Sequence, residues 1–296
     1  MNKLTELFNL LRIRQWHKNA FVLLGFFVLG DYDNYDLLFK AIIVTAAFCL
    51  VSSSMYIFND YHDIEADRSH PTKKLRPLAS GVIRIKTALF LAVMLCLSGL
   101  IISFYVNIIA LLVISLYVLN NISYSYVLKR YPIIDVFQIG FGFMLRIFAG
   151  TAGIGIHISE WMILTGFMIS LLIGFSKRFA ELSYSPASQK QRDVLQEYSL
   201  EILKAFMIIM AASTIITYSL YTLSPRSIEL HGTTNLIYTT PFVVFGIFRF
   251  LYLVLFHKSG DDPSSQIFKD KQLVVTVIIW ALVYGVIIYV KKSPFY

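Results

Sequence analysis

Charged residues are scarce in this chain: only 15% of its 296 residues are Asp, Glu, Lys or Arg, against about 25% in ordinary soluble domains. Together with a mean hydropathy of +0.66, this scarcity excludes a water-soluble globular protein. Cysteine is nearly absent as well. Cys49 and Cys96 both lie in apolar stretches, so we expect free thiols and no disulfide. The sequence also lacks internal repeats, low-complexity tracts and interdomain linkers, so we expect a single domain over residues 1–296.

Apolar windows, by contrast, recur along the whole chain, each of about 17–22 residues and long enough to cross about 30 Å of hydrocarbon. The short alternating strands of a membrane barrel are missing, so these windows predict helices. The expected fold class is all-α, a polytopic membrane protein with roughly nine transmembrane helices. Their expected ranges are 12–30, 37–58, 87–105, 107–126, 133–153, 160–176, 199–220, 236–256 and 273–290.

The distribution of basic residues predicts how the chain is oriented. Residues 1–18 are amphipathic and basic without a signal-peptide cleavage site, so we expect an interfacial helix lying on the membrane. With the N-terminus in the cytoplasm, the inside segments carry 19 Lys and Arg and the outside segments carry three. The positive-inside rule then predicts a cytoplasmic N-terminus, an outer C-terminus and cytoplasmic active-site loops at 59–86 and 177–198. Because no soluble basic domain presents the net charge of +8, we expect the bilayer and no nucleic acid as partner.

A charged stretch, NDYHDIEADRSHPTKKLRPLASG at 59–81, follows the second expected span directly. On one continuous helix, the carboxylates of Asp60, Asp63 and Asp67 lie within about 60° of one another, with Asn59 on the same side. Carboxylate and amide oxygens on one stripe suit Mg²⁺, which usually binds one or two carboxylates together with substrate phosphates. The alternative is a solvated loop that merely carries charge, which the N-D-x-x-D-x-x-x-D spacing disfavours.

Basic residues follow the acids in the same stretch. These basic residues would neutralise further phosphate oxygens, so the stretch predicts a Mg–diphosphate site at the cytoplasmic membrane boundary; they are Arg68, Lys73, Lys74 and Arg76. His62 and His70 lie nearby, but the sequence has no His and Cys spacing typical of zinc. We therefore interpret the two histidines as phosphate neighbours at most.

The stretch resembles the first aspartate motif of the UbiA-type intramembrane transferases. Its fuller form, NDxxDxExDRxHPxKxxRPxASG, resembles the branch of decaprenyl-phosphate phosphoribosyltransferases. Four further segments resemble that branch in the same order: LRIRQWHKN at 11–19, YSYVLKRYPIIDVFQIGFGFMLRIFAG at 124–150, SKRFAEL at 176–182 and DDPSSQIFKDKQL at 261–273. The resemblance implies a UbiA-like bundle with a cytoplasmic-side active-site cavity in a bacterial plasma membrane.

The activity that this resemblance implies is Mg²⁺-dependent phosphoribosyl transfer. The donor would be 5-phosphoribosyl 1-diphosphate, the acceptor a polyprenyl phosphate such as decaprenyl phosphate, and the by-product diphosphate. The metal ligands would be Asn59, Asp60, Asp63 and Asp67. Lys73 and Arg76 would bind the diphosphate, and Lys18, in the N-terminal motif, is a further substrate-binding candidate.

Prenyl-transferring members of the superfamily carry a second aspartate motif, D-x-x-x-D, where this chain has Lys177, Arg178 and Glu181. On a helix these three span about 100°, so they can face one pocket. We expect two phosphate-binding cations and an acid that positions substrate or binds metal. The alternative is that both cations only end the span at the headgroups.

Two other functions remain as alternatives. A prenyltransferase would move a polyprenyl group from its diphosphate to an aromatic acceptor, and the missing D-x-x-x-D motif argues against it. A transporter would place its acids near the bilayer midplane, whereas here they cluster at one end of a span.

The segment 124–150 completes the candidate set. Lys129 and Asp135 belong to the short loop after the fourth span, and either Tyr124 or Tyr126 can hydrogen-bond a phosphate there. Arg146 interrupts the fifth span, and an intramembrane arginine costs at least about 2.5–3.5 kcal/mol. We therefore expect Arg146 to meet an acceptor phosphate or to pair with a neighbouring helix.

Overall fold

The computed structural model describes residues 3–157, 159–184, 193–256 and 269–292. Every regular element within these ranges is a helix, as the sequence predicts. The chain divides into two compact units: unit 1 comprises residues 1–129 and 145–157, and unit 2 comprises residues 130–144 and 158–296.

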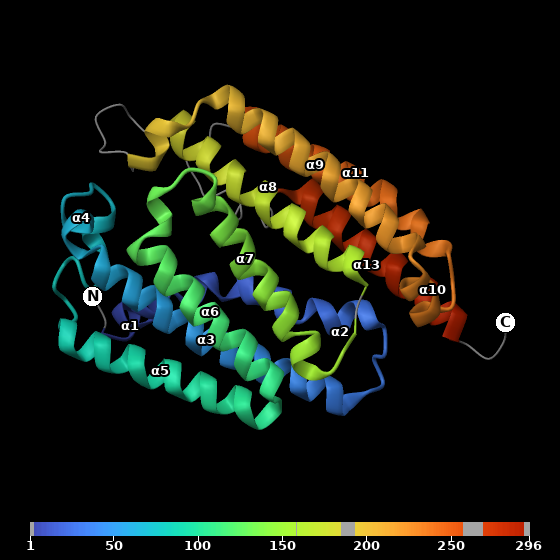
Figure 1. Ribbon diagram of the computed structural model, residues 1–296, viewed down its shortest axis with the longest axis horizontal. Coiled ribbons are helices and arrows are strands. Elements are labelled where there is room, and N and C mark those ends of the chain that lie inside the picture. Colours follow the sequence, from blue (N-terminus) through green and yellow to red (C-terminus); the bar gives the residue numbers. More distant parts are fainter. Residues whose placement is uncertain (1–2, 158, 185–192, 257–268, 293–296) are drawn as a thin grey trace. The chain divides into compact units, whose positions relative to one another are not determined.

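Eight helices of the described residues are long and apolar enough to cross a membrane, and they correspond to eight of the nine expected ranges. Unit 1 contains α3 (Tyr35–His62), α5 (Ile85–Val106) and α6 (Ile108–Tyr126), while α7 (Ile134–Ala149) supplies residues to both units (Figure 1). Unit 2 contains α8 (Glu160–Tyr184), α9 (Leu200–Leu223), α11 (Thr240–Phe256) and α13 (Lys271–Lys292).

Short helices form most of the remaining described chain. They are α1 (Lys3–Leu11), η1 (Ile13–Val22), α2 (Leu24–Leu29), α4 (Ile64–Arg68), η2 (Lys73–Leu75), η3 (Leu128–Arg130), η4 (Ala152–Ile154), η5 (Asp193–Glu197), α10 (Pro225–His231) and η6 (Asn235–Thr239), where η denotes a 3₁₀ helix. Residues 185–192 of the expected loop 177–198, most of the motif at 261–273 and the last four residues lie outside the described ranges.

The first expected span, 12–30, is not one continuous helix. It consists of the 3₁₀ helix η1 and the six-residue α2, and Arg12, just before η1, has a left-handed backbone (φ 49°). The segment still runs antiparallel to α3: Trp16 Nε1 donates to Ser53 Oγ at 3.0 Å, and Asn19 Nδ2 donates to Ser52 Oγ at 3.1 Å. Irregular backbone at membrane depth is tolerated where it is buried in protein. The ninth crossing stays a prediction.

Two glycines let this irregular segment lie close to the end of α7. A Cβ at Gly150 would be 1.6 Å from the carbonyl oxygen of Val22, and one at Gly25 would be 2.3 Å from that of Gly150. Both obstacles are backbone atoms, which cannot turn aside as a side chain can. Unit 1 therefore requires glycine at both positions.

In unit 1, α3 is more buried than α5 and α6, which pack against it (Figure 1). The helices approach closely at Gly99 of α5, where a Cβ would lie 2.8 Å from the carbonyl oxygen of Ala47. The opposite face of α5 exposes large apolar side chains such as Phe90 and Leu97. Both cysteines are free thiols, as expected, and Cys49 is buried next to η1, where Asn19 Nδ2 donates to its Sγ at 3.2 Å.

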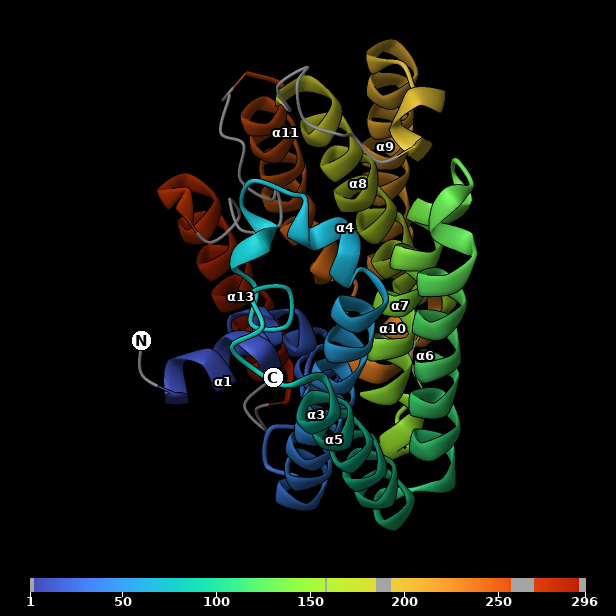
Figure 2. The same ribbon diagram turned by 90° about the vertical axis from the view of Figure 1, so that its left-hand side faces the viewer.

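The chain at the C-terminal end of α3 is also well packed. Figure 2 shows α4 continuing from α3 through a short turn. Leu10 of α1, Ile57 of α3 and Leu78 of the following loop are buried in one apolar cluster. The helix expected over 1–18 is therefore shorter, since α1 ends at Leu11, and its position on a membrane surface stays a prediction.

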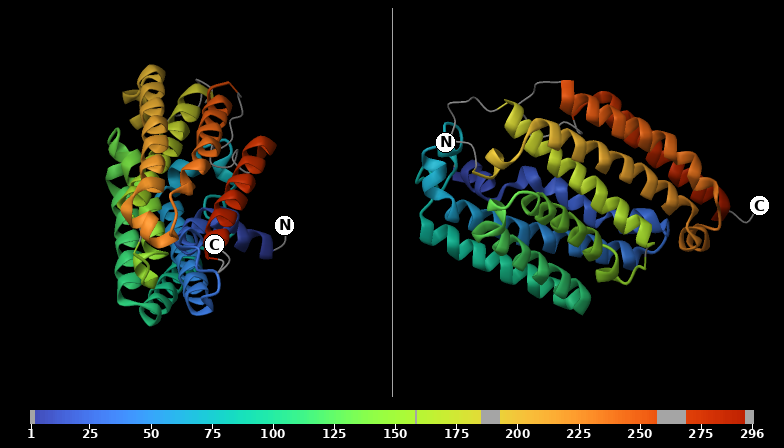
Figure 3. Two further views of the ribbon diagram at one scale, coloured as in Figure 1. Left: turned by 90° about the vertical axis from the view of Figure 1, so that its right-hand side faces the viewer. Right: turned by 45° about the horizontal axis from the view of Figure 1, so that its top comes forward.

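In unit 2, α8 and α9 pack together along their length, and α11 contacts both α9 and α13. Figure 3 shows this set of helices in yellow-green, gold, orange and red. Their core contains Leu172, Phe175 and Leu203 with many other buried apolar side chains. Arg249 of α11 binds Asp270, just before α13, with Nη2 2.8 Å from Oδ2.

Candidate active site

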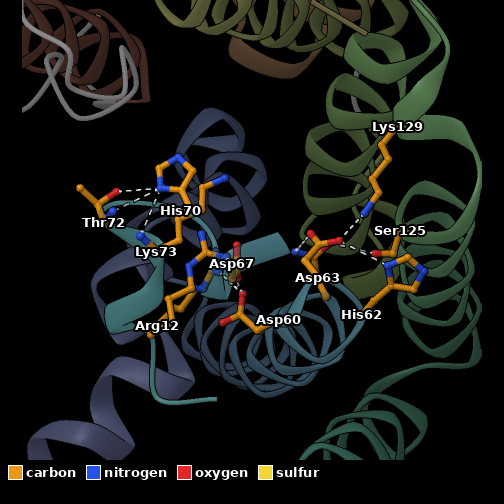
Figure 4. Close-up of polar contacts among 12 residues, drawn as sticks. Arg12, Asp60, His62, Asp63, Asp67, His70, Thr72, Lys73, Ser125 and Lys129 are labelled. Atoms are coloured by element: carbon orange, nitrogen blue, oxygen red, sulfur yellow. Dashed lines mark hydrogen bonds and ion pairs between the residues drawn. The ribbon is translucent and has the colours of Figure 1, made fainter. Parts of the chain in front are cut away.

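The helix expected to run continuously through Asn59–Asp67 is broken at Asp63. α3 ends at His62, Asp63 takes a non-helical backbone (φ −94°, ψ 7°), and α4 begins at Ile64. The three aspartates therefore do not share one stripe. Figure 4 shows Asp60 and Asp67 together on one side, whereas Asp63 points toward Lys129.

Asp60 and Asp67 share one guanidinium, that of Arg76. Its Nη1 lies 3.0 Å from Asp60 Oδ1 and 2.6 Å from Asp67 Oδ2. Arg12 pairs with the same oxygen of Asp60 (Figure 4). Both aspartates are only 3% exposed, and carboxylates are tolerated at such burial because cations pair with them. Arg12 was not among the predicted site residues, although it is the first arginine of the motif at 11–19.

Asp63 has a second set of partners. Lys129 Nζ, in η3, lies 2.5 Å from Asp63 Oδ1, and Asn59 Nδ2 donates to Asp63 Oδ2 at 3.3 Å. The amide oxygen of Asn59 accepts from Ser125 of α6. Burial alone would raise the pKa of Asp63, but the hydrogen bond and charge of Lys129, with His62, lower it below its ordinary value. Asp63 is thus held as a carboxylate.

The remaining predicted site residues of unit 1 make contacts close to their own positions in the chain. Lys18 Nζ donates to Gln15 Oε1 at 3.4 Å within η1. The backbone N–H of Lys73 donates to His70 Nδ1 at 3.3 Å, and burial and the charge of Lys73 lower the pKa of His70 (Figure 4).

The sequence did not decide between Tyr124 and Tyr126 as a phosphate ligand. Tyr124 is half-buried, and the ring of Tyr126 packs on His62, with 4.9 Å between the ring centroids. Both histidines contact the aspartates: the backbone N–H of His70 donates to the carbonyl oxygen of Asp67 at 3.1 Å, and His62 Nδ1 lies 3.3 Å from Asp63 Oδ1.

Arg146 is buried inside unit 1 and is only 4% exposed. Its Nε donates to Asn19 Oδ1 at 2.9 Å and its Nη2 donates to Tyr117 OH at 3.0 Å. The guanidinium also lies over the rings of Phe48 and Tyr117, 5.2 and 4.9 Å from their centroids. Of the two expectations for Arg146, these contacts favour pairing with neighbouring elements: the arginine ties η1 to α6 and α3.

A second charged cluster lies in unit 2. Arg178 is 1% exposed and Asp135 is fully buried, and Arg178 Nε lies 2.5 Å from Asp135 Oδ2. Glu181, one turn further along α8, binds Nη1 of the same guanidinium. This differs from the expectation of two cations presented to phosphate, because Arg178 is already neutralised by two carboxylates. Lys177, the neighbouring cation, is half-buried.

Tyr198 completes this cluster and was not predicted. Its hydroxyl donates to Asp135 Oδ1 at 2.9 Å and accepts the backbone N–H of Ile133. Ile133 has φ 67°, a left-handed backbone that costs a β-branched residue about 1–3 kcal/mol. No sequence pattern joins these positions, because Tyr198 is 63 residues beyond Asp135 in the chain.

The donor set of unit 1 fits Mg²⁺ in kind, because Asn59, Asp60, Asp63 and Asp67 offer hard oxygen ligands. Both arginines that bind Asp60 contact its Oδ1, so its other oxygen takes no part in these pairs. In arrangement, however, Asp63 is directed away from the other two. No three His, Cys, Asp or Glu side chains of the described ranges are grouped as a metal site. Binding by all three aspartates would require them to exchange basic partners for the ion.

Comparison with known proteins agrees with this fold. A model of the UbiA prenyltransferase family matches residues 19–274. The chain belongs to the UbiA prenyltransferase family. With eight long apolar helices in its described ranges, this family member is an integral membrane protein. The structure of a UbiA homolog from Archaeoglobus fulgidus bound to GPP and Mg²⁺ has the same fold, with a TM-score of 0.72 and 17% identity over 97% of this chain and 99% of that one.

Two relatives are similar in sequence over most of their length. Decaprenyl-phosphate phosphoribosyltransferase from Mycolicibacterium smegmatis is 30% identical over 97% of this chain and 94% of its own. The protein of the same name from Corynebacterium glutamicum is 32% identical over 95% of this chain and 86% of its own. The resemblance inferred from the sequence motifs is thereby confirmed.

Proposed function

We propose that this UbiA family member is a polyprenyl-phosphate phosphoribosyltransferase. It moves 5-phosphoribose from 5-phosphoribosyl 1-diphosphate to a polyprenyl phosphate, such as decaprenyl phosphate, and releases diphosphate. The observation that carries the proposal is the cluster of unit 1, in which Asp60, Asp63 and Asp67 are each paired with a basic side chain. The names of the two relatives, decaprenyl-phosphate phosphoribosyltransferase, support a polyprenyl phosphate acceptor and the transfer of a phosphoribosyl group.

The reaction needs little proton transfer. A phosphate oxygen of the lipid attacks the anomeric carbon of the donor, and the bond from that carbon to the diphosphate oxygen breaks. A phosphate monoester is already an adequate nucleophile at neutral pH, so no strong general base is required. The protein must instead align the two reactants and stabilise negative charge on the leaving diphosphate.

The basic residues of the cluster would supply that stabilisation. Arg12, Arg76 and Lys129 bind carboxylates here, and charge-assisted hydrogen bonds to phosphate oxygens are of the same kind. Arg76 offers a planar guanidinium that suits two phosphate oxygens at once. An incoming diphosphate can therefore replace the aspartates as partner of these cations.

The acids released by this exchange would hold the metal. Asn59, Asp60, Asp63 and Asp67 are the proposed ligands of Mg²⁺, the ion bound in the Archaeoglobus fulgidus homolog. When bound, Mg²⁺ supplies positive charge that offsets the charge of the leaving group. In the protein without ligand, the paired arginine and lysine side chains neutralise these carboxylates until a substrate binds.

Phosphoribosyl transfer differs from prenyl transfer in the number of positions at which the substrates carry phosphate groups. A phosphoribosyl donor and a lipid phosphate bring anionic groups at three positions, counting the diphosphate as one, whereas a prenyl donor brings only its own diphosphate. Lys177 and Arg178 stand where prenyl-transferring relatives have acids. Arg178 is paired with Asp135 and Glu181, and we propose that Lys177 and Arg178 bind the 5-phosphate or the lipid phosphate.

The proposed setting follows from the charge distribution. We place the N-terminus and residues 59–86 in the cytoplasm of a bacterium, where the water-soluble donor is made, and we treat both units as one transferase domain. Lys18, Lys73 and Tyr124 remain proposed substrate-binding residues.

A transfer assay tests the proposal. Purified protein in lipid nanodiscs is incubated with Mg²⁺, decaprenyl phosphate and 5-phosphoribosyl 1-diphosphate labelled in the ribose. Label in the lipid phase supports phosphoribosyl transfer. Transfer from labelled decaprenyl diphosphate to 4-hydroxybenzoate, with no label moved from the ribosyl donor, would support the prenyltransferase alternative instead.

A further inference from the structure

One hydroxyl in unit 2 joins the turn before α7 to the ion pairs of α8. Tyr198 is 8% exposed, and its hydroxyl donates to Asp135 Oδ1 at 2.9 Å while accepting the backbone N–H of Ile133. Asp135 uses its other oxygen, Oδ2, to bind Arg178. A single side chain thus contacts both a strained turn and the carboxylate that neutralises a buried arginine.

The turn at Ile133 needs such a restraint. Its left-handed backbone (φ 67°) is one that a β-branched residue rarely adopts. The carbonyl oxygen of Ile133 accepts the N–H groups of Val136 and Phe137, at 3.0 and 2.9 Å, so this residue sets the start of α7. If its own N–H lost its acceptor, Ile133 could relax toward ordinary backbone angles. Asp135, two residues further on, would then move.

We propose that Tyr198 is a positioning residue of the transferase. Its hydroxyl holds the Ile133 turn and the Asp135 carboxylate in the arrangement that fixes Arg178 on α8, next to Lys177. Tyr198 acts through Asp135 and Arg178 and need not touch substrate. The expected effect on turnover rests on the proposed function, whereas the expected effect on the backbone does not.

The chemistry of the hydroxyl suits this role. Burial and the neighbouring charge of Asp135 raise the pKa of Tyr198 well above its ordinary value. The hydroxyl therefore keeps its proton at physiological pH and remains a donor to the carboxylate. A phenylalanine at this position would fill the same space but could neither donate to Asp135 nor accept from Ile133.

Hydrogen exchange of the ligand-free, full-length protein tests the restraint directly. Tyr198→Phe should quicken exchange in the peptide 131–137 about tenfold, the effect of losing one buried hydrogen bond. The matched control is Tyr218→Phe in the same unit, whose hydroxyl also contacts two groups, Thr239 Oγ1 at 2.6 Å and Trp280 Nε1 at 2.7 Å. The control should leave exchange in 131–137 at the wild-type rate.

A second substitution tests whether turnover depends on the strained turn. Tyr198→Phe should lower phosphoribosyl transfer per folded protein about tenfold. Glycine adopts a left-handed backbone as readily as a right-handed one, so adding Ile133→Gly should restore most of the lost turnover. The same Ile133→Gly change in the Tyr218→Phe protein should leave turnover unaltered.

The results that would overturn the restraint, the positioning role and the proposed function can be told apart. Equal exchange of 131–137 in the Tyr198→Phe and Tyr218→Phe proteins would overturn the restraint, whatever the activity. Faster exchange with wild-type turnover, or a turnover loss that Ile133→Gly does not rescue, would overturn the positioning role. If the wild-type protein itself transfers no phosphoribose, the proposed function fails, and the exchange experiment still decides whether Tyr198 restrains the turn.

Discussion

Acids and bases in the candidate site of unit 1 occur as partners, not as separate groups. Asp60 and Asp67 share Arg76, Asp60 also binds Arg12, and Asp63 binds Lys129. In the proposed function, each pair joins a proposed metal ligand to a proposed phosphate ligand, and the two charges neutralise each other. A magnesium diphosphate would bring the complementary charges, so its binding would be an exchange of partners.

Removal of the Asp60 or the Asp63 carboxylate should therefore abolish most of the transferase activity. We expect Asp60→Asn and Asp63→Asn each to lower turnover about a hundredfold or more, because each removes a proposed ligand of the charge-stabilising ion. The control is Glu65→Gln, an exposed acid in the same stretch on α4. Near-normal turnover in both aspartate variants, measured on protein with an unchanged melting temperature, would remove the Mg–diphosphate assignment.

The pair of Asp63 and Lys129 also predicts a pH dependence of stability. Because the pKa of Asp63 is lowered in the folded protein, its ionised form stabilises the fold above the ordinary carboxyl pKa. That contribution is lost as the pH falls through the folded-state pKa. Lys129→Met removes the largest of the interactions that oppose burial of the Asp63 carboxylate, so it should destabilise the protein at pH 7 by about 1–2 kcal/mol.

Thermal unfolding between pH 3 and pH 8 measures this effect. The difference between wild type and Lys129→Met should be present at neutral pH and shrink toward acid pH. Lys40→Met is the control, because Lys40 pairs with Asp36 at the surface, where ion pairs contribute little. A difference that is constant over the pH range would show that Lys129 does not act through Asp63.

At the residue scale, the sequence identifies the charged groups but not their partners. The aspartate spacing predicts Asp60, Asp63 and Asp67 as a set, yet the one-helix assumption fails at Asp63, where α3 ends. Arg178 and Asp135 are 43 residues apart, so only the folded chain reveals that they neutralise each other. Arg12 and Tyr198 were missed because their importance comes from contacts across the fold.

At the scale of elements, the least regular segment is the one between Arg12 and Gly30. Hydropathy predicts a helix there because Phe21, Leu23 and their neighbours are apolar. The structure forms η1 and α2 instead, since Asn19 hydrogen-bonds Ser52 and Arg146, and Val22 lies against Gly150. Hydropathy measures how a residue partitions into lipid, and it contains no information on such contacts. The length and apolar composition of the other eight expected helices are enough to predict their ranges from the sequence.

The glycine contact between this segment and the end of α7 can be tested by adding one methyl group. Gly150→Ala should destabilise the protein by about 1–3 kcal/mol, because its Cβ would collide with backbone that cannot rotate away. Gly285→Ala in α13 is the matched control, since nothing lies within 4 Å of its added Cβ. There we expect no loss, or a gain of about 0.4–1 kcal/mol from the higher helix propensity of alanine. Equal melting temperatures of the two variants would contradict the close packing at Gly150.

At the scale of the whole molecule, orientation in the membrane can be measured independently of activity. The described chain between Ser69 and Thr234 contains five membrane-length helices, so these two residues should lie on opposite sides. The positive-inside rule places Ser69 in the cytoplasm. In a background with Cys49 and Cys96 replaced by serine, Thr234→Cys should react with an impermeant thiol reagent in intact cells. Ser69→Cys should react only after the inner membrane is opened, and the opposite pattern would reverse the orientation.

The account as a whole depends on which bond is broken and which group receives the sugar. The decisive measurement is diphosphate release by the purified protein, followed together with the mass of the lipid product. We expect release only when Mg²⁺, 5-phosphoribosyl 1-diphosphate and polyprenyl phosphate are all present, with one phosphoribosylated lipid formed per diphosphate released. The Asp60→Asn protein should form neither product. Release that does not need the lipid phosphate, or a lipid product without the phosphoribosyl mass, would contradict the proposed function.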